Sequence, residues 1–401
     1  MICLQGVVIN IFLKEECSMR YVKPYYYNEF KCIADKCLDT CCAGWQIVID
    51  DETLDKYSSE KDEFSQRLKN SIDWAEGVFY QNNGRCAMLN DNNLCDLVTA
   101  KGEGALCKTC HMYPRHIEEF EGVREYSLSL SCPVAAKMIL EDTNKLTFDV
   151  KEDEDIDPLE DEFEDFDFFM YTQLEEVREV IFKIIQNRDL SVDNRMSYIM
   201  DMARKLQQAV DEQEVYKMED IANEYQDILD NMSDGSIYDK DDKDDKEGFI
   251  KDKFEKVKSA YELFEELEVL RQDWPEIIED LKKNLYNGTY EDYSKIRDEF
   301  YNSFISEISA DRWEIFKEQL LMFFVYTYFL GSVYDDCVYS KLALATFSVC
   351  FIEELIISGW IRNSKKITID ECIELSYRYA REVEHSDDNL NILEEMFMER
   401  L

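Results

Sequence analysis

The sequence predicts a mainly α protein, in which a cysteine-rich, loop-rich N-terminal domain with a few short strands precedes an α-helical C-terminal domain. The 401 residues include only 12 glycines and 5 prolines, which favours long helices over a turn-rich β fold. Nine of the 14 cysteines lie between residues 32 and 132. From residue 168 onward, apolar residues recur at helical spacing almost throughout.

Composition divides the chain into four parts. Residues 1–18 form a doubtful extension, either an upstream addition or a short extra strand, because Met19 opens a stretch that resembles a natural protein start. Their apolar run GVVINIFL is too short for a membrane span and lacks the basic flank of a secretion signal. We expect a cysteine-rich domain over 19–150, an acidic linker over 151–170 and a helical domain over 171–401, with a disordered charged loop at 233–248. Within 152–167, eleven of sixteen residues are acidic. A solvated linker explains this run, and capture of a basic substrate segment is the alternative.

The elements follow from local patterns. We expect a short β-like run in QIVID, a helix over 51–80, and turns at Asn82-Asn83-Gly84 and Asp91-Asn92-Asn93. A half-buried strand through residues 126–130 would deliver Cys132. The runs 320–330 and 342–360 are apolar but fall short of an uninterrupted membrane helix, so we expect two core helices and no membrane partner.

The cysteines form two blocks, and thiolates that converge in this way are selected by soft metals and iron–sulfur clusters. Zinc prefers two Cys-x-x-Cys pairs, whereas only Cys107 and Cys110 form one here; a polynuclear iron–sulfur cluster tolerates irregular spacing better. Without an export signal the cytoplasm is the expected compartment, and its reduced thiols argue against disulfides. The candidate metal ligands are Cys32, Cys37, Cys41 and Cys42 in the first block, and Cys86, Cys95, Cys107, Cys110 and Cys132 in the second.

Other cysteines and the one nearby histidine are assigned differently. Cys337, Cys350 and Cys372 are scattered singly, which is typical of core residues. Cys3 and Cys17 fall in the doubtful extension. His111 follows the Cys107–Cys110 pair and is either a ligand or a hydrogen-bonded structural residue.

Net charge and missing motifs exclude several function classes. With 88 acidic and 45 basic residues the formal charge is −43, so the chain repels nucleic acid and attracts lysine-bearing protein surfaces. No glycine-rich loop suited to a dinucleotide or a conventional S-adenosylmethionine site follows a strand, and neither a Walker loop nor an HExxH motif occurs.

Four stretches of residues 20–140 closely resemble the flagellin lysine-N-methylase family: FKCIADKCLDTCCAGWQIVID, CAMLNDNNLCDL, LCKTCHMYPR and SLSLSCPVAA. The resemblance implies transfer of methyl groups from S-adenosylmethionine to lysine ε-amines of flagellin. It also implies an iron–sulfur cluster, expected to be 4Fe-4S, on the matched cysteines. The rival interpretation is a non-enzymatic zinc- or iron-chelating module on a helical partner-binding scaffold.

The spacing Cys37-x-x-x-Cys41 followed directly by Cys42 departs from the triplet of radical S-adenosylmethionine enzymes. Radical chemistry is not required, because a neutral lysine amine attacks a methylsulfonium directly once it is deprotonated and held in line. Aromatic walls attract both a sulfonium and a methylated ammonium. We hypothesise that these walls come from the aromatic residues beside the first cysteine block: Tyr25, Tyr26, Tyr27, Phe30 and Trp45.

Overall fold

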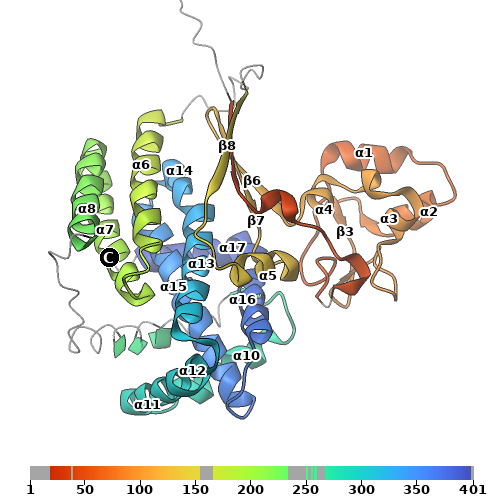
Figure 1. The fold of residues 1–401 in the computed structure, drawn as a ribbon. Helices are drawn as coiled ribbons and strands as arrows, with labels where there is room; N and C mark the ends of the chain where they lie inside the picture. Colours follow the sequence, from red (N-terminus) through yellow and green to blue (C-terminus); the bar gives the residue numbers. More distant parts are fainter. Residues whose placement is uncertain are drawn as a thin grey trace, which may run out of the picture.

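The computed structural model describes residues 19–37, 39–153, 166–233, 250–251, 254–255, 257–259 and 267–398. The proposed extension 1–18, residues 234–248 of the charged loop and residues 154–165 of the acidic run lie outside these ranges. A helical body, a four-stranded sheet and a small cysteine-rich lobe follow one another across the view in Figure 1. The mainly α prediction is confirmed, while the domain boundaries taken from composition stay predictions.

The four-stranded sheet lies between the lobe and the helical body (Figure 1). Its order is β6-β7-β1-β8, with β1 parallel to β7 and antiparallel to β8, and with β6 and β7 paired as an antiparallel hairpin. The strands are β1 (Met19–Pro24), β6 (Arg115–Phe120), β7 (Val123–Leu128) and β8 (Phe148–Asp153). After β7, a short turn places Cys132 at the N-terminus of α5 (Pro133–Glu141), where Pro133 fits because the first helical N–H needs no partner.

The cysteine-rich lobe consists of short elements around its own small core of Ile47, Ile49, Tyr57, Leu68, Phe79 and other buried residues. The helix expected over 51–80 is only partly correct: two helices end by Lys69, and two short hairpins follow. The first hairpin is closed by an Asx turn, in which Asp73 Oδ1 accepts from the N–H of Ala75, 3.0 Å away, and Gly77 takes a φ of +66°. The QIVID run forms a single bridge between Val48 and Val78. The elements are α1 (Asp51–Ser59), α2 (Ser65–Lys69), β2 (Ile72–Asp73), β3 (Val78–Phe79), β4 (Gln81–Asn82), β5 (Arg85–Cys86), α3 (Asp96–Lys101) and α4 (Lys108–Met112).

The helical body contains the long helices that the apolar periodicity predicts. Side-chain caps mark several starts, such as the capping box of Thr368 with Glu371 at the start of α16. The helices are α6 (Phe168–Ile185), α7 (Val192–Asp211), α8 (Met218–Ser233), α10 (Trp274–Leu281), α11 (Tyr290–Phe300), α12 (Ser306–Ile308), α13 (Ala310–Tyr328), α14 (Ser332–Asp335), α15 (Val338–Arg362), α16 (Ile369–Glu384) and α17 (Asp387–Met398). π-helical turns follow α10 at Lys282–Tyr286 and α11 at Tyr301–Ile305.

The apolar run 320–330 lies in α13 and the 3-10 turn that follows it, and the run 342–360 lies in α15; both helices run through the interior as expected. Among the described residues, α15 is the one helix long and apolar enough to cross a membrane, and its most apolar window is fully buried inside this structure. Its apolar character is therefore explained by packing in the core.

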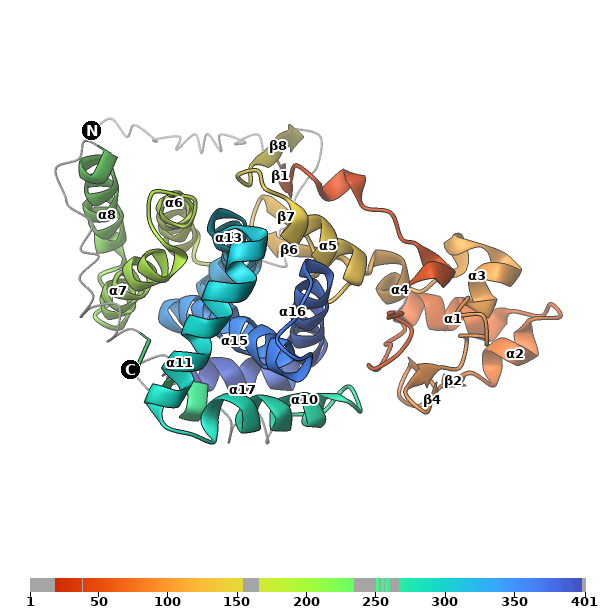
Figure 2. The same cartoon turned by 60° about the horizontal axis from the view of Figure 1, so that its bottom comes forward.

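One large core joins the sheet to the helices. Val22, Phe120 and Leu128 of the strands share it with residues from α5, α6, α7, α13, α15 and α16. A bidentate ion pair crosses the same contact: Arg178 of α6 donates to both carboxylate oxygens of Glu125 on β7, at 2.6 and 2.5 Å, with both side chains 4% exposed. The sheet is thus part of the helical body, and the lobe packs on a separate core beside α5 and α16 (Figure 2).

Candidate metal centre

Eight of the nine predicted cysteines line one cavity of about 630 Å³. Residues of the lobe, the first cysteine block, the start of α5 and the end of α16 line it. The ninth, Cys107, is fully buried one helical turn from Cys110, which does line the cavity. The lining cysteines are Cys32, Cys37, Cys41, Cys42, Cys86, Cys95, Cys110 and Cys132. Two segments separated by more than forty residues therefore bring their thiols to one place, as the sequence analysis expected.

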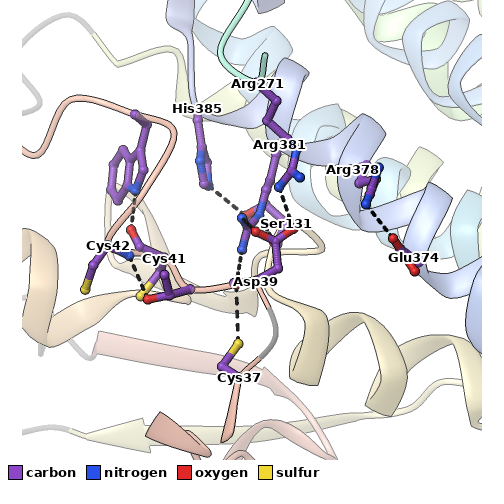
Figure 3. Close-up of polar contacts among 12 residues, drawn as sticks. Cys37, Asp39, Cys41, Cys42, Ser131, Arg271, Glu374, Arg378, Arg381 and His385 are labelled. Carbon is purple, nitrogen blue, oxygen red and sulfur yellow. Dashed lines mark hydrogen bonds and ion pairs between the residues drawn. The ribbon is translucent and has the colours of Figure 1, made fainter. Parts of the chain in front are cut away.

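The first block is held in place through Asp39. Arg381 of α16 donates from Nη1 to Asp39 Oδ1 at 2.6 Å and from Nη2 to the Asp39 carbonyl at 2.7 Å. Arg271 donates to the other carboxylate oxygen at 2.5 Å. The Cys37 thiol donates to the same Asp39 carbonyl, 3.3 Å away. The loop that carries Cys37 and Cys41 is thereby fixed to the helical body (Figure 3).

The second block is placed by tight turns. Asn83 and Gly84, with φ of +53° and +70°, connect β4 to β5 in a two-residue hairpin that ends at Cys86. Asn90 Oδ1 accepts hydrogen bonds from the N–H groups of Asn92 and Leu94, at 2.9 and 3.1 Å, and these bonds close the loop before Cys95. The turn signals read from the sequence are confirmed, and they serve to present sulfur atoms.

Backbone N–H groups point at several of these sulfurs. Cys86 Sγ accepts from the N–H of Met88, Cys95 Sγ from those of Leu97 and Val98, and Cys132 Sγ from those of Val134 and Ala135. The Cys107 sulfur likewise accepts from the N–H of Cys110. Such bonds stabilise a thiolate and orient it, and hydrogen bonds to sulfur are among the features that tune protein-bound iron–sulfur clusters.

The thiols differ widely in acidity. A hydrogen bond from the Cys41 thiol lowers the pKa of Cys42 to about 7, while the same contact, together with burial, raises the pKa of Cys41. Burial raises the pKa of Cys86 to about 12. Because metals bind thiolates, filling the site must release protons from thiols of this kind, so metal binding strengthens as pH rises.

The C-terminal end of α16 also contacts the turn before Cys132. Arg381 Nε donates to the Ser131 carbonyl at 2.8 Å, and the half-buried Glu384 accepts from Ser129 Oγ at 2.6 Å and from the N–H of Ser131 at 3.1 Å. His385 hydrogen-bonds to Ser131 Oγ at 2.8 Å, as Figure 3 shows. Burial, and then the charge of Arg381, lower the pKa of His385 to about 3, so this imidazole is neutral at physiological pH.

The aromatic residues divide into two groups. Phe30 and Trp45 line the cavity, as hypothesised, and Trp45 packs against His385 with ring centres 4.6 Å apart and ring planes tilted by 34°. The other three were placed wrongly, because Tyr26 and Tyr27 are buried in the large core and Tyr25 bonds to Asp142 beyond α5. None of the three lines the cavity. Tyr113, which the sequence analysis did not select, lies in the cavity wall instead.

The remaining predicted residues are also placed. His111 lines the cavity beside Cys110. Cys372 is a buried core residue, as expected. Cys350 is half-buried against the large core, whereas Cys337 is partly exposed at the start of α15, where its thiol donates to the Asp335 carbonyl. The sequence analysis did not select Arg381 or Asp39, whose ion pair fixes the first cysteine block. They lie 342 positions apart, and no local sequence pattern marks either residue.

The donor chemistry fits a thiolate-bound group. Within the ranges that the structure describes, no three His, Cys, Asp or Glu side chains surround a point at the spacing of ligands to a single metal ion. The thiols instead surround the cavity, and that arrangement suits a polynuclear core wider than one ion. The backbone N–H groups aimed at four sulfurs support the same assignment.

Residues 178–401 match the family model described as the FliB lysine N-methylase C-terminal domain, which is more than half of the chain. The chain belongs to the FliB lysine N-methylase family. The matched region includes α16, and therefore Arg381 and Glu384, whose side chains contact the cysteine loops.

Individual relatives agree with this family. The chain is 30% identical over 138 residues to the lysine-N-methylases of Salmonella typhimurium and Salmonella choleraesuis, which covers 32% of the chain and 34% of each relative. It is also 30% identical over 138 residues to the flagellar biosynthetic protein FliU of Salmonella muenchen, covering 82% of that protein. The chain thus spans about a third of the length of the lysine-N-methylases that it matches. No solved structure matches the chain significantly.

Proposed function

We propose that the protein transfers methyl groups from S-adenosylmethionine to lysine ε-amines of flagellin in the cytoplasm, and that its cysteine cavity holds an iron–sulfur cluster. One observation carries the proposal. The helical domain that matches the FliB lysine N-methylase family lines the cysteine cavity with Arg381, and its Glu384 and His385 bond to the turn before Cys132. The names of the relatives, lysine-N-methylase and flagellar biosynthetic protein, support the reaction and the substrate.

The thiols would hold the cluster, and the cluster would supply an iron able to ligate the amino and carboxylate groups of the methyl donor. The protein's own residues supply the rest of the environment. A lysine that enters the cavity loses water, and desolvation lowers its pKa toward the neutral amine that attacks a methylsulfonium. Phe30, Trp45 and Tyr113 offer aromatic faces to the cationic donor and to the methylated ammonium product.

Charge favours a basic substrate. The formal charge of −43 attracts a lysine-bearing protein surface and raises its rate of encounter at low ionic strength.

The test is incubation of anaerobically purified protein with isotopically labelled S-adenosylmethionine and flagellin, followed by mass spectrometry of flagellin lysines. The proposal predicts labelled methyl groups on lysine, and none when flagellin is omitted or the methyl donor is replaced by S-adenosylhomocysteine. Absence of label with a metal-loaded, folded protein would refute methyl transfer and favour the non-enzymatic metal-binding scaffold.

A further inference from the structure

The nine thiols are divided between two hydrophobic cores. Cys86 and Cys107 are buried members of the small core of the lobe, and Cys42, Cys95 and Cys110 pack against that same core. Cys132 belongs to the large core of the helical body. The cavity that the thiols line therefore lies at the boundary between two separately packed units. A metal site formed by the lobe alone would not extend across that boundary.

Backbone contacts tie the lobe thiols to one another. The N–H of Cys86 donates to the carbonyl of Cys42 at 2.8 Å, so these residues are neighbours although they are 44 positions apart in the sequence. A β-bridge joins Leu89 to Cys95 and brings the second hairpin back beside the loop. Cys107 and Cys110 start α4, and their side chains contact each other. These five thiols thus form one group with rigid backbone support.

The other four thiols gather at the boundary with the helical body. Cys37 bonds to the Asp39 carbonyl, which Arg381 also holds, and Arg381 in turn bonds to the carbonyl of Ser131, the neighbour of Cys132. Cys32 precedes Cys37 on the exposed approach to the cavity, where Cys32 is exposed and Cys37 half-buried. The adjacent residues Cys41 and Cys42 lie where the two groups meet. Cys42 packs against the small core of the lobe, and its carbonyl accepts from Cys86, whereas Cys41 is not part of that core and follows Asp39, which Arg381 holds.

We propose that the chain holds two neighbouring metal centres. The first would use Cys32, Cys37, Cys41 and Cys132, and the second Cys42, Cys86, Cys95, Cys107 and Cys110. The inference rests on the proposed function only in taking the thiols as metal ligands. Four thiols are the complement of one cubane iron–sulfur cluster, and five more remain that a single cluster leaves without a role.

The two centres differ in their surroundings, and this difference assigns their roles. The second is enclosed by the small core of the lobe, which has few other buried residues, so its metal would serve to fold the lobe. The first lies at the exposed boundary beside Arg381, where a substrate can approach. The first centre is therefore the one that faces methyl donor and lysine.

Metal counting tests the division on the intact chain. Protein reconstituted anaerobically with iron, sulfide and zinc is desalted, and its iron, zinc and acid-labile sulfide are measured per chain. The inference predicts about eight irons with about eight sulfides per chain, because no three side chains in the described ranges are spaced to hold a single ion such as zinc. A total of about four irons and four sulfides, with or without zinc, would overturn it.

A variant locates the centres. Cys37→Ser/Cys132→Ser is expected to lose one centre and keep the other, with the metal count falling by that amount and the lobe still protected from protease. The matched control is Cys337→Ser, a thiol outside the cavity, which should keep the full count. Loss of all metal in a folded double variant would contradict two centres. If the double variant does not fold, the count on the intact chain decides. Methyl transfer by the intact chain is assayed in parallel. If that chain holds one centre and is fully active, the inference of two centres is refuted and the proposed methyl transfer is not.

Discussion

Replacing Arg381 by methionine removes the main contact between the helical body and the cysteine loops. The guanidinium is 4% exposed and makes three charge-assisted hydrogen bonds, two to Asp39 and one to the Ser131 carbonyl, at 2.6 to 2.8 Å. Breaking a buried ion pair costs about 3–5 kcal/mol, and Asp39 keeps Arg271 as a partner. We therefore expect the free energy of unfolding to fall by an amount near the lower limit of this range, about 3 kcal/mol.

The assay is urea denaturation followed by tryptophan fluorescence, with iron content measured on the same samples. Arg381→Met should lower the free energy of unfolding and also reduce bound iron, because Cys37 and Cys132 lose their shared support. Arg381→Lys should lose less stability and less iron than Arg381→Met, since lysine keeps the positive charge and one or two of the hydrogen bonds.

The matched control is Arg378→Met, one turn earlier on α16. Arg378 pairs with Asp273 and Glu374 while 21% exposed and contacts no cysteine loop, so its removal should cost under about 1 kcal/mol and leave iron unchanged. The reasoning is refuted if Arg381→Met retains wild-type stability and iron, or if Arg378→Met reduces both equally.

Three more predictions follow from other contacts. Arg178→Met should destabilise the protein by about 4 kcal/mol in urea melts, because it leaves Glu125 buried and unpaired, and adding Glu125→Leu should restore part of that loss. Burial raises the pKa of Glu382 to about 7, so between pH 4.5 and 7 the unfolded carboxyl ionises before the folded one and stability falls as pH rises. Glu382→Gln should remove this fall and be more stable by up to about 3 kcal/mol above pH 7; equal pH profiles would contradict the assignment. The methylation rate should drop about tenfold between low and high salt, and a rate indifferent to ionic strength would remove the role of the acidic surface.

Local patterns predicted much of this molecule. Helical periodicity located the long helices, and Asn83-Gly84 marked the hairpin that presents Cys86. Cysteine spacing selected all eight thiols of the cavity wall and Cys107 beside it. In each case the residues that form the sequence pattern lie within a few positions of the structural feature that they predict.

What the sequence could not reveal depends on distant pairs. Glu125 lies on β7, where the alternation of Tyr126 and Leu128 predicts that their face of the strand, and not that of Glu125, is buried. Glu125 is nevertheless buried, because Arg178, 53 positions away, neutralises its charge. Asp39 and Arg381 appear as ordinary surface charges until the fold brings them together. Tyr26 and Tyr27 lie just before the first cysteine block in sequence but are buried in the large core, so proximity along the chain misplaced them.

Iron and acid-labile sulfide in anaerobically purified protein test the central claim most directly. If sulfurs from both cysteine blocks share an inorganic core, the protein is brown and contains iron and sulfide in near-equal amounts, and both decline when Cys132 is replaced. A colourless protein that takes up neither iron nor sulfide on anaerobic reconstitution, with all nine thiols open to alkylation, would contradict the account.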